Sequence, residues 1–180
     1  EMSKMSNSGA LFDLVKLNDI CKNKIGSYTA QRVYDLATEW AKTYDDELYN
    51  LLTANPEYSV TMFGFDRNPD KPRKDIGKWS EVRQAFSFMF DELFDGKYDE
   101  IDGVSKDDIA SILDAYPQMY DENADSSAWF DTLKDLSEKI GFAREVKEYK
   151  KNPDAYKGHV GSVSNVLRVA VTGRTKSPDL

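Results

Sequence analysis

The chain has 180 residues, of which 40% are hydrophobic and 31% charged, so it can bury a core as one or two small domains. Its formal net charge of −8 disfavours nucleic-acid binding, and it has neither a run of about 18 apolar residues to span a membrane nor the apolar segment of a secretory signal. The single cysteine, Cys21, excludes an internal disulfide, so we expect a protein of the reducing cytoplasm.

The charge is unevenly distributed along the chain. Residues 84–140 carry 15 acidic and 4 basic side chains, residues 141–180 carry 4 acidic and 8 basic ones, and residues 67–83 carry 3 acidic and 6 basic ones. Two basic islands therefore flank an acidic block. Either the islands converge on one polyanion, or they are scattered lysines on an ordinary acidic surface.

Apolar residues at helical spacing predict α-helices in the first half of the chain. The first long stripe predicts one helix from Thr29 to Leu52, capped by Ser27 or Thr29 and ending before Pro56. A second helix is expected from Glu57 to Phe65. The prolines and glycine of the next segment, Arg67 to Lys78, predict a loop.

The same period continues in the second half. A third helix is expected after Ser80, and Gly96 to Gly103 then breaks the pattern, which predicts a boundary between two helical subdomains. Ser105 and Asp108 form a variant of the capping box, and Ser126 or Ser127 is expected to open another helix. With no long strand-like alternation, the sequence predicts an all-α fold.

A last amphipathic helix is expected from near Ser162, and it leads into a basic loop. Its apolar stripe consists of Val163, Val166, Leu167, Ala170 and Val171. Gly173 suits the left-handed position after a helix, and Pro178 prevents the helix from resuming. Three basic residues then lie near one loop: Arg168, Arg174 and Lys176. Such a loop could hold unstacked RNA, although a surface helix with solvated basic residues has the same pattern.

The segment LRVAVTGRTKSPDL, Leu167 to Leu180, resembles the anticodon-reading end of bacterial glutamyl-tRNA synthetases. That family has a pattern close to L-R-x-A-[LV]-T-G-x-x-x-[ST]-P-x-L, and every fixed position is present. The resemblance implies that the readers of the first two anticodon bases are Arg168, Ser177, Pro178 and Leu180. Arg174 and Lys176 fall at variable positions and inherit no role.

A second candidate site is the basic loop around Lys71-Pro72-Arg73, with Arg67 nearby. In the family, an arginine of the first helical subdomain, often within an R-P-R-like element, reads the third anticodon base. The resemblance therefore implies Arg73 and Lys71 as candidates, while solvated loop charges remain the alternative. Whether the glutamine tRNA is also accepted is left open.

No catalytic constellation is expected in the chain. Lys4 to Ser8 echo the KMSKS loop of class I synthetases, but SGALFD, Ser8 to Asp13, matches a later segment at the end of the family's stem-contact domain. His159 is the single histidine, and there is no phosphate-binding glycine motif. The acidic pairs are interpreted as solvated helix termini rather than metal ligands: Asp45-Asp46, Asp99-Glu100 and Asp107-Asp108.

The resemblance covers nearly the whole chain and implies three parts. Residues 1–25 would be the end of the stem-contact domain, residues 26–103 a first helical anticodon-binding subdomain, and residues 104–180 a second one truncated at its C-terminus. The chain then looks like a piece of a longer synthetase, and it should hold no cofactor and be inactive alone.

The implied function is recognition of tRNA-Glu by a glutamate–tRNA ligase, whose upstream domains use ATP and Mg²⁺ to join glutamate to the tRNA. We expect a cytoplasmic monomer that binds neither DNA nor membrane. The alternative is a helical protein–protein interaction domain without RNA binding, which the negative charge and the aromatic content would suit.

Overall fold

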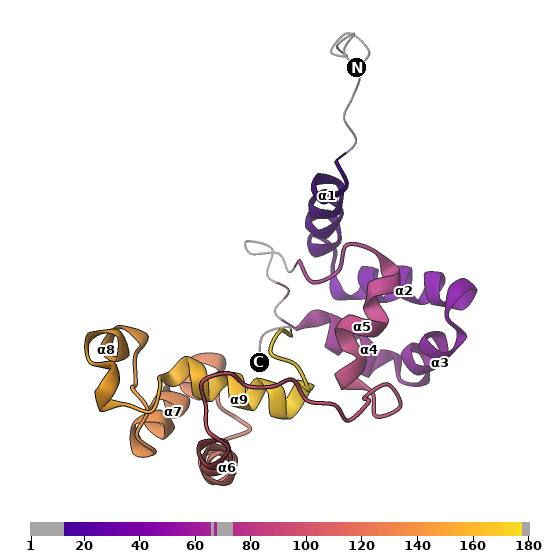
Figure 1. Cartoon of the computed structure of the whole chain (residues 1–180). Helices are drawn as coiled ribbons and strands as arrows, with labels where there is room; N and C mark the ends of the chain where they lie inside the picture. The colour runs from indigo at the N-terminus through magenta and orange to yellow at the C-terminus, as the bar shows by residue number, and fades with distance from the viewer. Residues whose placement is uncertain (1–12, 66, 68–73, 178–180) are drawn as a thin grey trace, which may run out of the picture. The chain divides into compact units, whose positions relative to one another are not determined.

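The computed structural model describes residues 13–65, 67 and 74–177, and within these ranges the chain is all-α, as the helical periodicity predicted. The described residues contain α-helices and short 3-10 helices but no β-strand, and one isolated parallel bridge joins Ala143 and His159. The chain divides into two compact units between Leu93 and Phe94, here called unit 1 and unit 2 (Figure 1). Over the described ranges, every helix is too short or too polar to cross a membrane.

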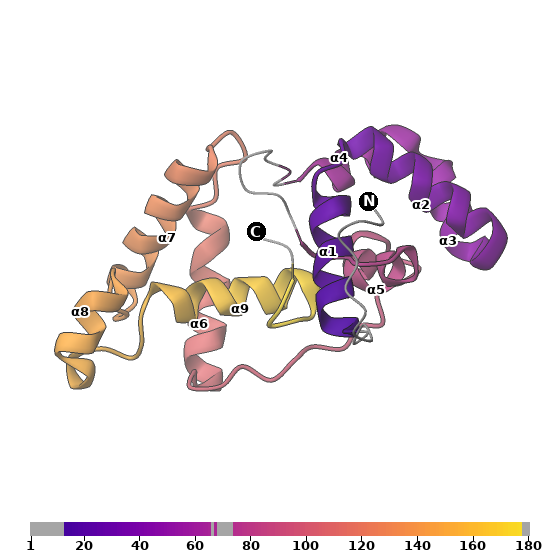
Figure 2. The same cartoon turned by 90° about the horizontal axis from the view of Figure 1, so that it is seen from above.

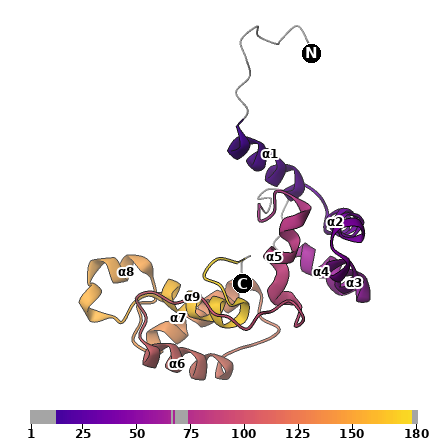
Figure 3. The same ribbon diagram turned by 45° about the vertical axis from the view of Figure 1, so that its right-hand side comes forward.

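Unit 1 is built around the helix α2. Its α-helices are α1 (Leu14–Gly26), α2 (Ala30–Tyr44), α3 (Asp46–Ala54), α4 (Pro56–Gly64) and α5 (Val82–Phe86). In Figure 3, α2, α3, α4 and α5 gather together, and α1 extends from them. The core is apolar and fully buried at its centre, where it contains Val33, Ala37, Leu52, Phe63 and Val82.

The predicted single helix from Thr29 to Leu52 is wrong, because Asp45 divides it into α2 and α3. The backbone of Asp45 leaves the helical region at φ −156° and ψ 81°, and its side chain accepts a hydrogen bond from the Leu48 N–H at 3.1 Å. Arg83 donates to the same carboxylate, with 2.7 Å between its Nε and Oδ2 of Asp45. This guanidinium lowers the pKa of Asp45, so the carboxylate stays charged and caps α3.

The expected helix after Ser80 is a short one. The α-helix α5 has five residues and lies between two 3-10 helices, Trp79–Glu81 and Ser87–Met89. Its residues Val82 and Phe86 are buried, as their spacing predicted. The helix after it stops where Phe90 adopts an extended backbone.

Unit 2 packs its last helix, α9, against two others. Its helices are α6 (Lys106–Ala115), α7 (Ser126–Lys139), α8 (Val146–Lys151) and α9 (Val160–Thr172), and α9 contacts both α6 and α7 (Figure 2). The centre of the core is fully buried and includes Ile112, Leu133, Leu136, Phe142 and Val163. The sequence did not predict α8, which is short, polar and largely exposed.

Two predicted caps are confirmed. Thr29 caps α2, since its Oγ1 accepts from the N–H of Arg32 at 3.2 Å. Ser105 caps α6 by accepting from the Asp108 N–H at 3.1 Å, and its hydroxyl donates to the Asp108 carboxylate at 2.6 Å. Asp108 thus lies at the position of the capping-box glutamate, where its carboxylate accepts from the serine hydroxyl.

Two helices of unit 2 start close to their predicted positions. The helix α7 begins at Ser126, one of the two serines predicted to open it, and its cap is Asp125, which accepts from the N–H of Ala128 at 2.8 Å. The helix α9 begins at Val160, two residues before the expected start, because Nδ1 of His159 accepts from the Gly161 N–H at 3.0 Å. The single histidine is therefore a helix cap.

Candidate nucleic-acid interface

The helix α9 positions the C-terminal loop by burying one face between α6 and α7. Val163, Val166 and Leu167 are buried as predicted, at no more than 4% exposure. The stripe was wrong at its end, because Val171 is 61% exposed while Val169 is 3% exposed. In the last turn the inward face is thus the one that carries Val169. Thr172, three residues further along, is also buried, and its hydroxyl accepts from the N–H of Arg174 in the loop.

Gly173 ends α9 in the predicted left-handed conformation, at φ +73°. Its N–H donates to the carbonyl of Val169 at 2.8 Å, and its own carbonyl accepts from the Asp99 N–H at 2.8 Å. A Cβ at this position would lie 2.5 Å from the carbonyl oxygen of Lys97 and 3.1 Å from the ring of Phe94. Glycine is therefore required here both for its backbone conformation and for the close approach of residues 94–97.

The loop after Gly173 is fixed by two side chains. Asp99 accepts from Thr175 twice, from its N–H at 2.8 Å and from its hydroxyl at 3.0 Å. Thr172 donates its hydroxyl to the carbonyl of Arg168 at 2.7 Å and accepts from the Arg174 N–H at 3.2 Å. The hydrogen bonds from Thr175 lower the pKa of the Asp99 carboxyl, and the nearby Arg174 charge adds to the effect.

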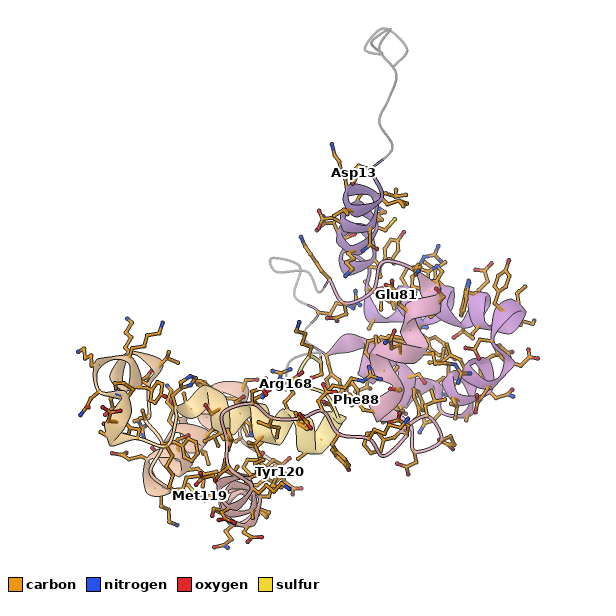
Figure 4. All side chains as sticks on the ribbon, in the orientation of Figure 1. Asp13, Glu81, Phe88, Met119, Tyr120 and Arg168 are labelled. Carbon is orange, nitrogen blue, oxygen red and sulfur yellow. The ribbon has the colours of Figure 1, made fainter. Side chains whose placement is uncertain are left out.

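Arg168 and Ser177, two of the residues that the resemblance implied, lie in direct contact. Nη1 of Arg168 donates to Oγ of Ser177 at 2.9 Å and to its carbonyl oxygen at 3.1 Å, and the pair is half-buried. Figure 4 shows Arg168 on α9. We call the five interacting residues the C-terminal clamp: Asp99, Arg168, Thr172, Thr175 and Ser177. The clamp holds the loop at the residue that directly precedes Pro178 in the sequence.

The other predicted site residues lie outside the described residues: Lys71, Arg73, Pro178 and Leu180. Arg67, which borders the basic loop, is described and is engaged within unit 1. It donates to the carbonyls of Phe63, Ile25 and Tyr28 at 2.8, 3.0 and 3.0 Å, so it links the end of α4 to the turn between α1 and α2. Arg67 therefore has a structural role in unit 1.

Asp99 and Thr175 were not predicted as part of this site. Asp99 was expected to be one of a solvated acidic pair, whereas its carboxylate bonds a residue 76 positions further along the chain. No local spacing rule connects residues so far apart. Among the described residues, no group of three or more His, Cys, Asp or Glu side chains could hold a metal ion.

Comparison with known proteins finds relatives that share one name and match the chain over nearly its whole length. The glutamate–tRNA ligase of Clostridium perfringens (strain 13) is 44% identical over 184 residues, a match that covers 100% of this chain and 34% of the relative. That of Acetivibrio thermocellus is 43% identical over 179 residues, 99% of this chain and 33% of the relative. That of Sorangium cellulosum is 36% identical over 183 residues. No family model and no solved structure matches the chain.

The chain is thus an all-α protein of two helical units, and the second unit ends in a clamped loop that carries basic side chains. The chain is homologous to the C-terminal region of glutamate–tRNA ligases. It spans about a third of the length of the curated relatives it matches.

Proposed function

We propose that the chain is the tRNA-binding C-terminal part of a glutamate–tRNA ligase and that it recognises the anticodon of tRNA-Glu. In this proposal the longer protein uses ATP and Mg²⁺ to attach glutamate to the tRNA, in the cytoplasm and as a monomer. The parts are those expected from the sequence: residues 1–25 from a stem-contact domain, then anticodon-binding subdomains at 26–103 and 104–180.

The C-terminal clamp carries the proposal for unit 2. It fixes Arg168 and Ser177 against each other, with 2.9 Å between Nη1 and Oγ, directly before Pro178. A loop ordered before the RNA arrives loses little conformational entropy on binding, which favours affinity. We propose that Arg168, Ser177, Pro178 and Leu180 contact the first two anticodon bases, and that Lys71 or Arg73 contacts the third.

One feature favours the alternative, a protein-interaction domain. Unit 2 contains a groove of about 610 Å³ between residues 98–104, α6 and α9. Its lining includes the apolar side chains of Ile101, Ile109 and Val166 and the acidic residues Asp99 and Glu100. Such a groove would suit an apolar peptide with a basic residue.

Binding measurements separate the two functions. We expect the chain to bind tRNA-Glu more tightly than the same tRNA with its anticodon bases changed, since the proposed contacts are to unstacked bases. We also expect the affinity to fall steeply from 50 to 200 mM salt, because lysine and arginine contacts to phosphate release counterions. Equal affinity for the two tRNAs contradicts anticodon recognition, and a flat salt profile favours the protein-interaction domain.

A further inference from the structure

Unit 1 contains a second groove whose lining is aromatic and basic. It has a volume of about 380 Å³ and lies between α1, the turn after it, α2 and residues 77–80. The side chains that give it its chemistry are Cys21, Lys24, Tyr28, Trp40, Lys78 and Trp79. We call it the α1–α2 groove. Among the described residues that line it, none is acidic.

The three aromatic side chains are only half-buried, although they pack on the core of unit 1. Tyr28, Trp40 and Trp79 each line the groove and keep part of their surface exposed. Aromatic faces of this kind stack on nucleic-acid bases, at about 1–3 kcal/mol per base.

Two exposed lysines complete the groove. Nζ of Lys24 lies 5.3 Å from the centre of the Tyr28 ring, a cation–π distance, so the charge is held beside an aromatic face. Lys78 also lines the groove, and its ion pair with Glu81 is long, at 3.9 Å. Two ammonium groups beside aromatic faces match a nucleotide, which combines a phosphate with a base.

The wall that carries Lys78 and Trp79 is held against α1 by Gly77. A Cβ on Gly77 would contact the side-chain amide of Asn18 and lie 3.3 Å from Cγ of Lys22, so this segment packs closely on α1. The Gly77 N–H donates to the carboxylate of Glu81 at 2.7 Å, at the start of α5 (Figure 4). The groove is therefore formed by two segments of unit 1, α1 and residues 77–80, that pack closely on each other.

We propose that the α1–α2 groove binds an unpaired nucleotide of the tRNA, with the base against the aromatic side chains and the phosphate between Lys24 and Lys78. The inference rests on the proposed function, since it assumes that the chain binds tRNA. It adds a contact on unit 1 that is separate from the C-terminal clamp and from the basic loop at residues 71–73.

Cys21 provides a site-specific test, because it is the single cysteine of the chain and lines the groove. The whole chain is treated with N-ethylmaleimide, with and without saturating tRNA-Glu, and the alkylation rate of Cys21 is measured by mass spectrometry. We expect bound tRNA to slow the alkylation. If the tRNA binds and the rate is unchanged, the groove is not a contact site, although anticodon recognition could still hold.

A charge-matched pair of variants tests the lysines. In the double variant Lys24→Gln, Lys78→Gln we expect the slope of log affinity against log salt to fall by about 1, because the two lysines are proposed to hold one phosphate. The control Lys42→Gln, Lys139→Gln removes two exposed lysines elsewhere and should change the slope much less. Equal losses in the two variants would overturn the inference in favour of a general electrostatic effect. Failure of the unaltered chain to bind tRNA would overturn the proposed function together with it.

Discussion

Replacing Arg168 by alanine should release the C-terminal loop while leaving the rest of unit 2 folded. The variant loses two hydrogen bonds from one guanidinium, to Oγ and to the carbonyl oxygen of Ser177. Hydrogen bonds of charged groups contribute about 1.5–3 kcal/mol each when buried, and much less when exposed. Since this pair is half-buried, we expect a total of about 1–3 kcal/mol, which is an increase of roughly 5- to 150-fold in the population of the released loop.

Hydrogen exchange of single amides measures this release directly. In the unaltered chain the Thr175 N–H donates to Asp99 at 2.8 Å, so it should exchange slowly. Arg168→Ala should accelerate its exchange by the same factor, whereas amides in the middle of α9 should keep their rates because α6 and α7 cover that helix. Ser177→Ala should give a smaller acceleration, since it keeps the carbonyl acceptor.

The RNA measurement then distinguishes a positioning contact from a base contact. If Arg168 acts only by ordering the loop, Arg168→Ala should weaken tRNA-Glu binding no more than it raises the released population, and a larger loss indicates contact with the RNA. Lys139→Ala is the control; Lys134 is unsuitable because Asp131 and Glu145 hold its ammonium group at 3.1 and 3.5 Å. An unchanged Thr175 exchange rate in Arg168→Ala would refute the clamp.

Three further predictions concern glycine, acid and a helix cap. Gly173→Ala should lower the melting temperature more than Gly96→Ala. Both glycines have a positive φ, which costs about 1–2 kcal/mol for alanine. Of these two positions, only Gly173 has other atoms within 4 Å of the added Cβ. The pKa of Asp99 is lower in the folded state than in the unfolded state. The stability that its carboxylate adds is therefore complete above the unfolded-state pKa, near 3.9, and is lost as the pH falls through the lower folded-state pKa. Thr175 exchange corrected for its intrinsic pH dependence should therefore accelerate only below about pH 4, and Asp99→Asn should abolish that step. Asp45→Ala removes the cap of α3 and should cost about 1–2 kcal/mol in urea unfolding; a cost within error of zero would contradict the cap.

Most of the helices were predictable because they bury one face of their own sequence, whereas α1 and α8 are largely exposed and were not predicted. A stripe at helical spacing is a local property, and so is a serine or threonine that caps a helix at its own N-terminus, as Thr29 does. The division at Asp45 was not predictable in this way. The apolar residues on both sides keep one helical period across it, and the arginine that holds the carboxylate, Arg83, lies 38 residues further along.

The residues of the C-terminal clamp also differ in whether a local sequence pattern could predict their contacts. Arg168 and Ser177 are nine residues apart, within one helix turn and loop, so a motif could place them together. Asp99 is part of the same clamp but belongs to a segment that reads as a polar linker. Its role follows from packing of that segment on the end of α9 at Gly173, which a single sequence does not encode in any local pattern.

The net charge of −8 is a weak argument against RNA binding, because several carboxylates of the acidic block make hydrogen bonds or ion pairs within unit 2. Asp99 accepts hydrogen bonds from Thr175 in the C-terminal loop, and Asp125 caps α7. Asp108 accepts a hydrogen bond from Ser105 and forms an ion pair with Lys157 at 2.8 Å. The ion pair of Lys157 with Asp108 carries no net charge, and at physiological salt the field of the other carboxylates is screened beyond a Debye length of about 8 Å. What an approaching phosphate meets is then decided by the few cations that share one groove or one loop, and these have to be identified residue by residue.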